Sequence, residues 1–284
     1  MNPTKELPFV VGAGLGRTGT HSLQAALMTL GYNKPFHMHE ILDGVVDADP
    51  WFELAANERA TGMKNKTLAL KTAQNVIDLG YTATTDYPCC LLYPEFLELT
   101  NGKVILSVRS KPSDWKNSVL DTIGIITLSF FKPPFSFSPF FSQFAGVLDP
   151  WLWERTGVAN LGQIDVPKDS LLDYQNGIET AYTQWIETAK KQVPPGQLLI
   201  HHAKEGYPPI CKFLGIAEQD CPKEDYPHIG DTQEMKQLIR TFEVVTEVFW
   251  PVVALLGLLL VLVIRRVMRR NGKGMFSKTA EKVD

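Results

Sequence analysis

The stretch Gly12-Ala-Gly-Leu-Gly-Arg-Thr-Gly-Thr-His-Ser22 decides how this chain folds, because it joins an apolar run at 8–11 to an apolar helical repeat over 22–30. We expect a strand, a glycine-rich turn and a helix. Glycines let backbone N–H groups point inward, and a helix N-terminus carries about half a positive charge. Arg17, Thr20 and Ser22 add side-chain donors. The stretch therefore predicts a phosphate-binding turn.

The loop lacks the features of an ATP-hydrolysing site. A Walker A loop has Lys directly after its last glycine and then Ser or Thr for magnesium. Here Thr20 follows Gly19, and the cation, Arg17, lies inside the loop. No apolar strand downstream ends in an Asp that could serve as a Walker B residue. ATP hydrolysis is therefore not expected.

A dinucleotide site is a second reading of the same glycines. Residues 14–19 fit the G-x-G-x-x-G fingerprint, which also needs an acidic residue about 20 positions later at a strand end. Glu40 lies near that distance, but residues 37–42 do not form a clear strand pattern. An NAD(P)-dependent oxidoreductase therefore stays the less favoured alternative.

The loop, written Gly-x-Gly-Arg-Thr-Gly-Thr-x-Ser-Leu, resembles the 5′-phosphosulfate loop of the sulfotransferases, in the branch found in fungi, algae and flatworms. Residues 103–118 are similar to that family's 3′-phosphate site, a strand ending in Arg before a helix that carries Ser. Residues 206–228 resemble its "G-W-x-P-L-C-x-F-L-G … F-P-H" region. The resemblance spans 8–240 and implies a P-loop fold that binds 3′-phosphoadenosine 5′-phosphosulfate (PAPS) without a metal.

The resemblance also implies roles for particular residues. Asp86 in Thr85-Asp86-Tyr87-Pro88 falls where cytosolic sulfotransferases carry their catalytic His, and Arg17 falls where they carry a catalytic Lys. The expected cofactor-binding residues are Gly14, Gly16, Arg17, Thr18, Gly19, Thr20, His21, Ser22, Arg109 and Ser118.

Other assignments stay open. Asp86 could simply cap the helix that follows Pro88, since Asp often does so. Asn117 could replace Ser118, because the spacing from Arg109 is one residue longer than in the cytosolic enzymes. His37 and His39 could approach an acceptor, although a His beside an apolar stretch is more often structural. The family's adenine-side Arg-Lys-Gly motif has no counterpart here.

Composition excludes several classes of protein. The chain has 284 residues and a net charge of −3, and no basic and aromatic residues interleave, so nucleic acid is not an expected partner. His201 and His202 have no Cys or carboxylate at metal-ligand spacing, so we assign no metal site. The four cysteines form no disulfide framework and are interpreted as thiols.

Alternation of helical and strand patterns predicts a three-layer α/β fold with a parallel sheet. Strands are expected near Phe9, Tyr81, Val104 and Leu198. Helices are expected over 51–60, 67–79, 89–99, 114–123 and 171–190. Residues 128–141 hold six Phe among several Pro, which disfavours a long helix. The segment could be a lid over an apolar acceptor pocket, a patch resting on lipid or, less favoured, plain core packing.

The C-terminal region predicts a membrane anchor. Residues 248–264 carry no charge and would span about 26 Å as a helix, with Phe249 and Trp250 at one end and the basic run 265–270 at the other. We expect a P-loop domain over 1–243, a single transmembrane helix over 244–265 and a basic tail over 266–284. The basic flank favours a lumenal domain, in which the sequon at Asn65 would be usable. The N-terminus shows no signal peptide, so we expect a tail anchor in an endomembrane such as the endoplasmic reticulum, with a cytosolic domain.

These patterns favour a membrane-anchored sulfotransferase that moves a sulfuryl group from PAPS to a hydroxyl or amine on a small-molecule or lipid acceptor. A catalytically inactive nucleotide-binding membrane protein is the alternative from another class.

Overall fold

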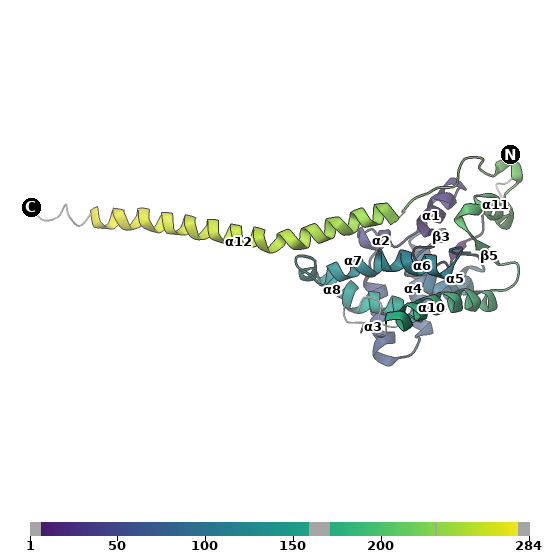
Figure 1. Cartoon of the computed structure of the whole chain (residues 1–284). Helices are drawn as coiled ribbons and strands as arrows, with labels where there is room; N and C mark the ends of the chain where they lie inside the picture. Colours follow the sequence, from purple (N-terminus) through teal and green to yellow (C-terminus); the bar gives the residue numbers. More distant parts are fainter. Residues whose placement is uncertain (1–6, 159–170, 231, 278–284) are drawn as a thin grey trace, which may run out of the picture.

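The computed structural model describes residues 7–158, 171–230 and 232–277, which form an α/β domain and one long C-terminal helix (Figure 1). The sheet has five parallel strands in the order β2-β3-β1-β4-β5. Their bounds are β1 (Val10–Gly12), β2 (Pro35–Phe36), β3 (Ala83–Thr84), β4 (Lys103–Ser107) and β5 (Leu198–His201). The predicted α/β class with a parallel sheet is confirmed. β2 was not expected, because two residues show no periodicity.

Successive strand residues enter different cores because side chains alternate between the two faces of a sheet. Val11, Val104 and Leu106 belong to the larger core, whereas Val10 and Ile105 belong to the smaller one. Helices α1 and α11 supply the smaller core, and α3, α4, α5, α9 and α10 supply the larger one. Helices therefore cover both faces of the sheet, which makes the predicted three layers.

The helical segments of the domain follow one another in this order: α1 (Thr20–Thr29), α2 (His39–Leu42), α3 (Asp49–Thr61), α4 (Lys66–Asp78), η1 (Cys89–Leu92), α5 (Tyr93–Thr100), α6 (Pro112–Leu120), α7 (Ile123–Phe130), η2 (Phe135–Phe137), α8 (Pro139–Gln143), η3 (Phe144–Leu148), α9 (Asp149–Thr156), α10 (Leu171–Gln192), η5 (Ala203–Glu205), α11 (Pro208–Leu214) and η6 (Glu218–Asp220). The five predicted helices are present. The one expected over 89–99 begins as the 3₁₀ turn η1, because Pro94 fits only the first turn of an α-helix, and α5 continues it.

The Phe-rich segment breaks into short helices, as its prolines predict. Its first part, Leu128 to Phe130, continues α7, and the rest forms η2 and α8. Rings of Phe130, Phe135, Phe141 and Phe144 contact one another, with centroids 4.7–6.4 Å apart. The segment therefore has its own aromatic cluster at the edge of the larger core.

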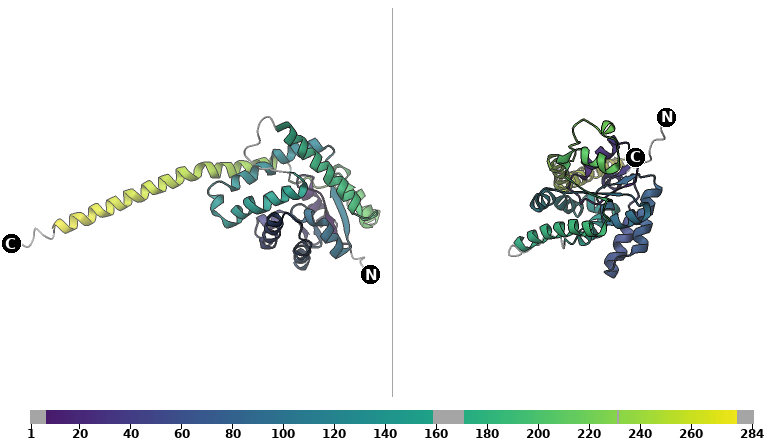
Figure 2. Two further views of the ribbon diagram at one scale, coloured as in Figure 1. Left: turned by 90° about the horizontal axis from the view of Figure 1, so that it is seen from below. Right: turned by 90° about the vertical axis from the view of Figure 1, so that its right-hand side faces the viewer.

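The C-terminal helix α12 (Thr232–Ser277) continues through the predicted boundary at 243/244 without a break and then projects away from the domain (Figure 2). Its stretch Met235–Met268 is long and apolar enough to cross a membrane. Phe242 packs against the larger core, and Lys236 pairs with Asp121 at 3.2 Å. The start of the helix therefore belongs to the domain.

Two of the four cysteines are disulfide-bonded, so the expectation of four thiols is wrong. Cys211 and Cys221 form a disulfide that joins α11 to the segment after η6, whereas Cys89 and Cys90 are buried thiols. Ten residues separate the bonded pair in sequence. Sequence spacing alone did not show that α11 and the following turn bring the two side chains together.

Candidate functional site

The glycine loop lies at the carboxyl ends of β1, β3 and β4, where parallel α/β sheets place their ligands. It needs glycine because other chain segments touch its backbone. A Cβ at Gly14 would lie 1.9 Å from Ser107 Oγ, and one at Gly16 would lie 2.8 Å from the Tyr87 ring. The helix α1 then begins after Gly19, and no side chain caps it. The N–H groups of its first turn have no intrahelical partner, an arrangement that suits an anion.

Indole and hydroxyl groups fix the loop from several elements. Trp115 Nε1 on α6 donates to the Gly16 carbonyl, and Trp185 Nε1 on α10 donates to the Ala13 carbonyl, both at 2.8 Å. Thr18 Oγ1 donates to the Leu15 carbonyl and pairs with Ser107 Oγ, both at 2.7 Å. Thr18 is buried in these contacts, so they occupy its hydroxyl within the protein.

Arg17, Arg109 and Ser118 meet beside the loop. Arg17 has a left-handed backbone, with φ 71°, and its carbonyl accepts from Arg109 Nε at 2.7 Å. Arg17 Nε donates to Ser118 Oγ at 3.3 Å. The Arg109 backbone N–H donates to Tyr182 Oη at 2.8 Å, which anchors the end of β4. Two guanidinium groups and a hydroxyl thus converge next to the anion turn, a combination suited to phosphate oxygens.

Residues 229–230 also contact the glycine loop and the start of α1, although they lie more than 200 positions away in sequence. Ser22 Oγ donates to the Ile229 carbonyl at 3.3 Å, and the Ile229 N–H lies 3.1 Å from that hydroxyl. Arg17 Nη1 donates to the Gly230 carbonyl at 3.1 Å. Sequence reasoning assigned these residues no role. The neighbouring Tyr226-Pro-His228 motif was the signal that could have located them.

Asp86 follows β3 and is buried next to the loop, with φ 65°. Burial raises the pKa of its carboxyl to about 6, although hydrogen bonds from the Tyr87 and Met38 backbone and the Arg17 charge oppose the rise. Asp86 Oδ1 has no hydrogen-bond partner within the described residues, and it faces the Gly16 backbone. No side chain caps η1, so the alternative in which Asp86 serves as a helix cap is not seen.

His37 links Asp86 to a wider polar group. Its Nε2 lies 3.2 Å from Asp86 Oδ2 and 3.3 Å from Thr20 Oγ1, and its Nδ1 lies 3.1 Å from His39 Nδ1. Burial, reinforced by the nearby His21, His39 and Arg17 charges, holds the pKa of His37 well below its usual value. His37 is therefore a neutral hydrogen-bonding group that orients the carboxylate.

The dinucleotide alternative does not fit this arrangement. In the Rossmann order β1 lies between β2 and β4, whereas here it lies between β3 and β4. Glu40 lies in α2 rather than at a strand end, and its Oε2 accepts from Tyr81 Oη at 2.9 Å. His201 Nε2 donates to the Gly206 carbonyl at 3.0 Å. The searched, described residues hold no group of His, Cys, Asp and Glu side chains suited to a metal.

These features define an α/β protein with a parallel sheet and a buried acidic group beside a glycine-rich loop. Residues 9–235 match the family described as "Sulfotransferase domain", and the chain belongs to the sulfotransferase family. A relative, Ava biosynthesis cluster protein M of Aspergillus versicolor, is 29% identical over 234 residues, which cover 78% of this chain and 80% of that protein.

Proposed function

We propose that this protein transfers a sulfuryl group from PAPS to a hydroxyl or amine acceptor. The observation that carries the proposal is the buried Asp86 carboxyl, whose Oδ1 faces the glycine loop without a partner in the described part of the chain. Family membership supports transferase chemistry, and the biosynthesis-cluster relative supports a small-molecule acceptor.

The donor would be held by the anion loop and the two arginines. The backbone from Gly14 to Gly19 and the start of α1, with the side chains of Thr20, His21 and Ser22, would bind the 5′-phosphosulfate, while Thr18 holds the loop from within. Arg109 and Ser118 would bind the 3′-phosphate that distinguishes this nucleotide from ADP. Arg17 lies between these two groups, because it contacts Ser118 and belongs to the loop.

Asp86 would act as the general base. It accepts the acceptor's proton while the acceptor oxygen or nitrogen bonds to sulfur and the bond from sulfur to the bridging phosphate oxygen breaks. Arg17 stabilises the negative charge that develops on that bridging oxygen. With a pKa of about 6, Asp86 is mostly ionised at neutral pH and remains basic enough to accept a proton. His37 holds Asp86 Oδ2, which leaves Oδ1 for the acceptor.

The proposed site requires no metal, since Arg17, Arg109 and the loop N–H groups supply the positive charge. The proposed location is a membrane to which α12 anchors the domain. The cytosolic orientation stays a prediction. The Cys211–Cys221 disulfide favours a lumenal domain, because disulfides persist in oxidising compartments. The basic flank at Arg265–Arg266 favours the same orientation, because basic residues beside a span tend to face the cytosol.

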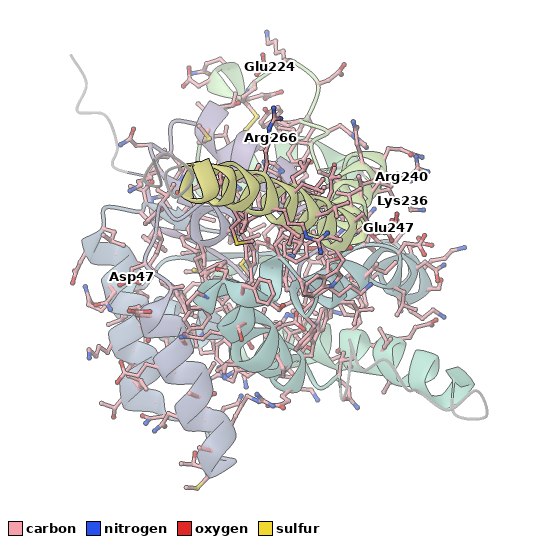
Figure 3. The ribbon with its side chains drawn as sticks, turned by 90° about the vertical axis from the view of Figure 1, so that its left-hand side faces the viewer. Asp47, Glu224, Lys236, Arg240, Glu247 and Arg266 are labelled. Atoms are coloured by element: carbon pink, nitrogen blue, oxygen red, sulfur yellow. A yellow bond between two sulfur atoms is a disulfide. The ribbon has the colours of Figure 1, made fainter. Side chains whose placement is uncertain are left out.

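Thermal stabilisation by adenosine 3′,5′-bisphosphate, compared with ADP and NAD, tests donor recognition on the full chain. The bisphosphate should stabilise the protein more than ADP does, because only it carries the 3′-phosphate. Arg109→Ala should remove this preference. Arg240→Ala, which removes an equal charge from an exposed position on α12 (Figure 3), should preserve it.

Equal stabilisation by ADP and the bisphosphate would reject the 3′-phosphate assignment. Stabilisation by the bisphosphate without transfer of labelled sulfate to any of a panel of alcohols, phenols and amines would favour the inactive nucleotide-binding alternative.

A further inference from the structure

An open cavity of about 380 Å³ lies between α2, the start of α3 and α8. Most of its lining is apolar: Ile41, Leu42, Val46, Phe52, Pro139 and Phe140. This volume falls at the small end of the range for ligand sites. The cavity therefore suits one hydrocarbon chain or a small ring system. A second cavity, about 540 Å³, lies near Asn101 and Gln197, where β4 and β5 begin, at the opposite edge of the sheet from the site.

The cavity lies close to the proposed base. Ile41, which lines the cavity, follows His37 by only four residues, across a turn in which the Ile41 N–H donates to the Met38 carbonyl at 3.0 Å. His37 in turn contacts Asp86 at 3.2 Å. A molecule whose apolar part occupies the cavity can thus extend a polar end toward Asp86. Residues 37–42 form the connection, because His37 contacts Asp86 and, a few residues later, Ile41 and Leu42 of α2 line the cavity.

The cavity also lies on the side of the domain from which α12 leaves. Figure 1 shows α2, α7 and α8 at that side, and Figure 3, which views the molecule along α12, shows Asp47 of the cavity rim on the same face. Asp47 and Asp49 place charges at the rim while the interior stays apolar.

The aromatic cluster next to the cavity reaches the apolar span of α12. Phe135 contacts Phe242, with ring centroids 4.7 Å apart, and Phe137 contacts Phe249 at 5.8 Å. Phe137 is 65% exposed, and Trp250 is 58% exposed. Aromatic side chains at the start of an apolar span are typical of the headgroup region. When α12 spans a bilayer, η2 and α8 therefore lie at the membrane surface.

We propose that the acceptor is an amphiphilic alcohol that partitions into the bilayer. Its hydrocarbon part enters the α2–α8 cavity from the membrane surface and its hydroxyl meets Asp86. The Phe-rich segment is then the part of the domain that rests on lipid, next to the entrance. This inference rests on the proposed sulfuryl transfer and on the anchoring role of α12.

The test uses the full chain in phosphatidylcholine vesicles with labelled PAPS and two alcohols. Butanol is water-soluble and reports the transfer step, whereas eicosanol stays in the membrane. We expect eicosanol to be sulfated when it shares the protein's vesicles and not when it is confined to separate vesicles. Transfer at equal rates from separate vesicles would overturn delivery through the bilayer.

The cavity is tested by a matched pair of variants. Leu42→Gln alters the cavity wall, and Leu79→Gln makes the same change at a position outside it, where the side chain is 52% exposed compared with 41% for Leu42. Leu42→Gln should lower the ratio of kcat/KM for eicosanol to that for butanol by about tenfold, which corresponds to losing about two methylene contacts. Leu79→Gln should leave the ratio unchanged. An unchanged ratio in Leu42→Gln would overturn the cavity assignment while transfer to butanol upholds the proposed function.

Photolabelling distinguishes a failure of the proposed function from a failure of the cavity assignment. If neither alcohol is sulfated, these alcohols are not acceptors and the panel of phenols and amines tests the proposed function, while a long-chain alcohol carrying a diazirine tests the cavity directly. Labelling of residues 41–52 and 139–143 that eicosanol competes away supports an amphiphile site. Labelling elsewhere overturns it.

Discussion

Asp86→Asn separates the catalytic role of Asp86 from its cost to the fold. Asn is the matched substitution because Asp86 has φ 65°, a left-handed conformation that Asn adopts more readily than most residues. It also keeps an acceptor oxygen for the N–H groups of Tyr87 and Met38. It removes only the charge and the ability to accept a proton.

The stability effect follows from the raised pKa. Burial raises the carboxyl pKa from 3.8 to about 6, and a shift of about two units corresponds to roughly 3 kcal/mol. Above pH 6 the group is ionised in both the folded and unfolded chains, so the folded protein bears this full cost. Below pH 4 both are protonated and the cost disappears. Asp86→Asn should therefore raise the free energy of unfolding by up to about 3 kcal/mol at pH 7.5, and by almost nothing at pH 3.5.

Asp86→Asn should lower the rate of sulfate transfer, although it raises the free energy of unfolding. Loss of a general base lowers turnover by about 10²–10⁴-fold. In the wild-type protein kcat/KM should rise with pH through an apparent pKa near 6, because the ionised carboxyl is the active form. Denaturant unfolding of the full chain in detergent at the two pH values, with sulfate transfer at pH 7.5, measures both effects. Asp43→Asn, at an exposed position after α2, is the control and should change neither.

Two results would refute the reasoning. An Asn variant that is no more stable than the wild type at pH 7.5 would reject the burial argument. Unchanged turnover in Asp86→Asn, in a protein shown to transfer sulfate, would remove Asp86 from the mechanism and direct attention to His37 and His39.

Four further predictions concern other parts of the molecule. Arg17→Ala should weaken bisphosphate binding as well as turnover, because Arg17 contacts Ser118 and faces the developing charge, and a normal dissociation constant in calorimetry would contradict this. Cys211→Ser should lower the free energy of unfolding by about 2–3 kcal/mol, the value expected for a disulfide that closes so short a loop. Titration of the denatured, unreduced wild-type protein should find two thiols rather than four. A chain ending at residue 247 should be soluble and bind the bisphosphate, since Phe242 and Lys236 are retained, and aggregation would show that the apolar span belongs to the domain. Asn65 should remain unglycosylated if the domain faces the cytosol, and a mobility shift on glycosidase treatment that Asn65→Gln abolishes would establish the lumenal orientation.

Local patterns in the sequence were sufficient to predict those elements whose own residues show a clear periodicity or composition. The glycine loop, the strands near Phe9 and Val104 and the apolar C-terminal helix each show a periodicity or composition that depends only on neighbouring residues. The family resemblance located Asp86 and Arg109 at the ends of strands, and parallel strands bring their carboxyl ends to one edge. Arg17, Asp86, Arg109 and Ser118 were therefore expected to lie close together, as they do.

Only the tertiary structure decided the contacts between distant segments. Gly230 is 213 residues from Arg17 along the chain, and His37 reaches Asp86 through the two-residue strand β2, which has no periodicity to detect. The Cys211–Cys221 disulfide and the contact of Phe137 with Phe249 likewise depend on how whole helices pack. Periodicity reports which face of an element is apolar, whereas the partner of that face is decided by the packing of the complete core. The sequence by itself thus determined the family and the anion loop, and the packed chain determined which groups surround Asp86 and where the apolar cavity opens.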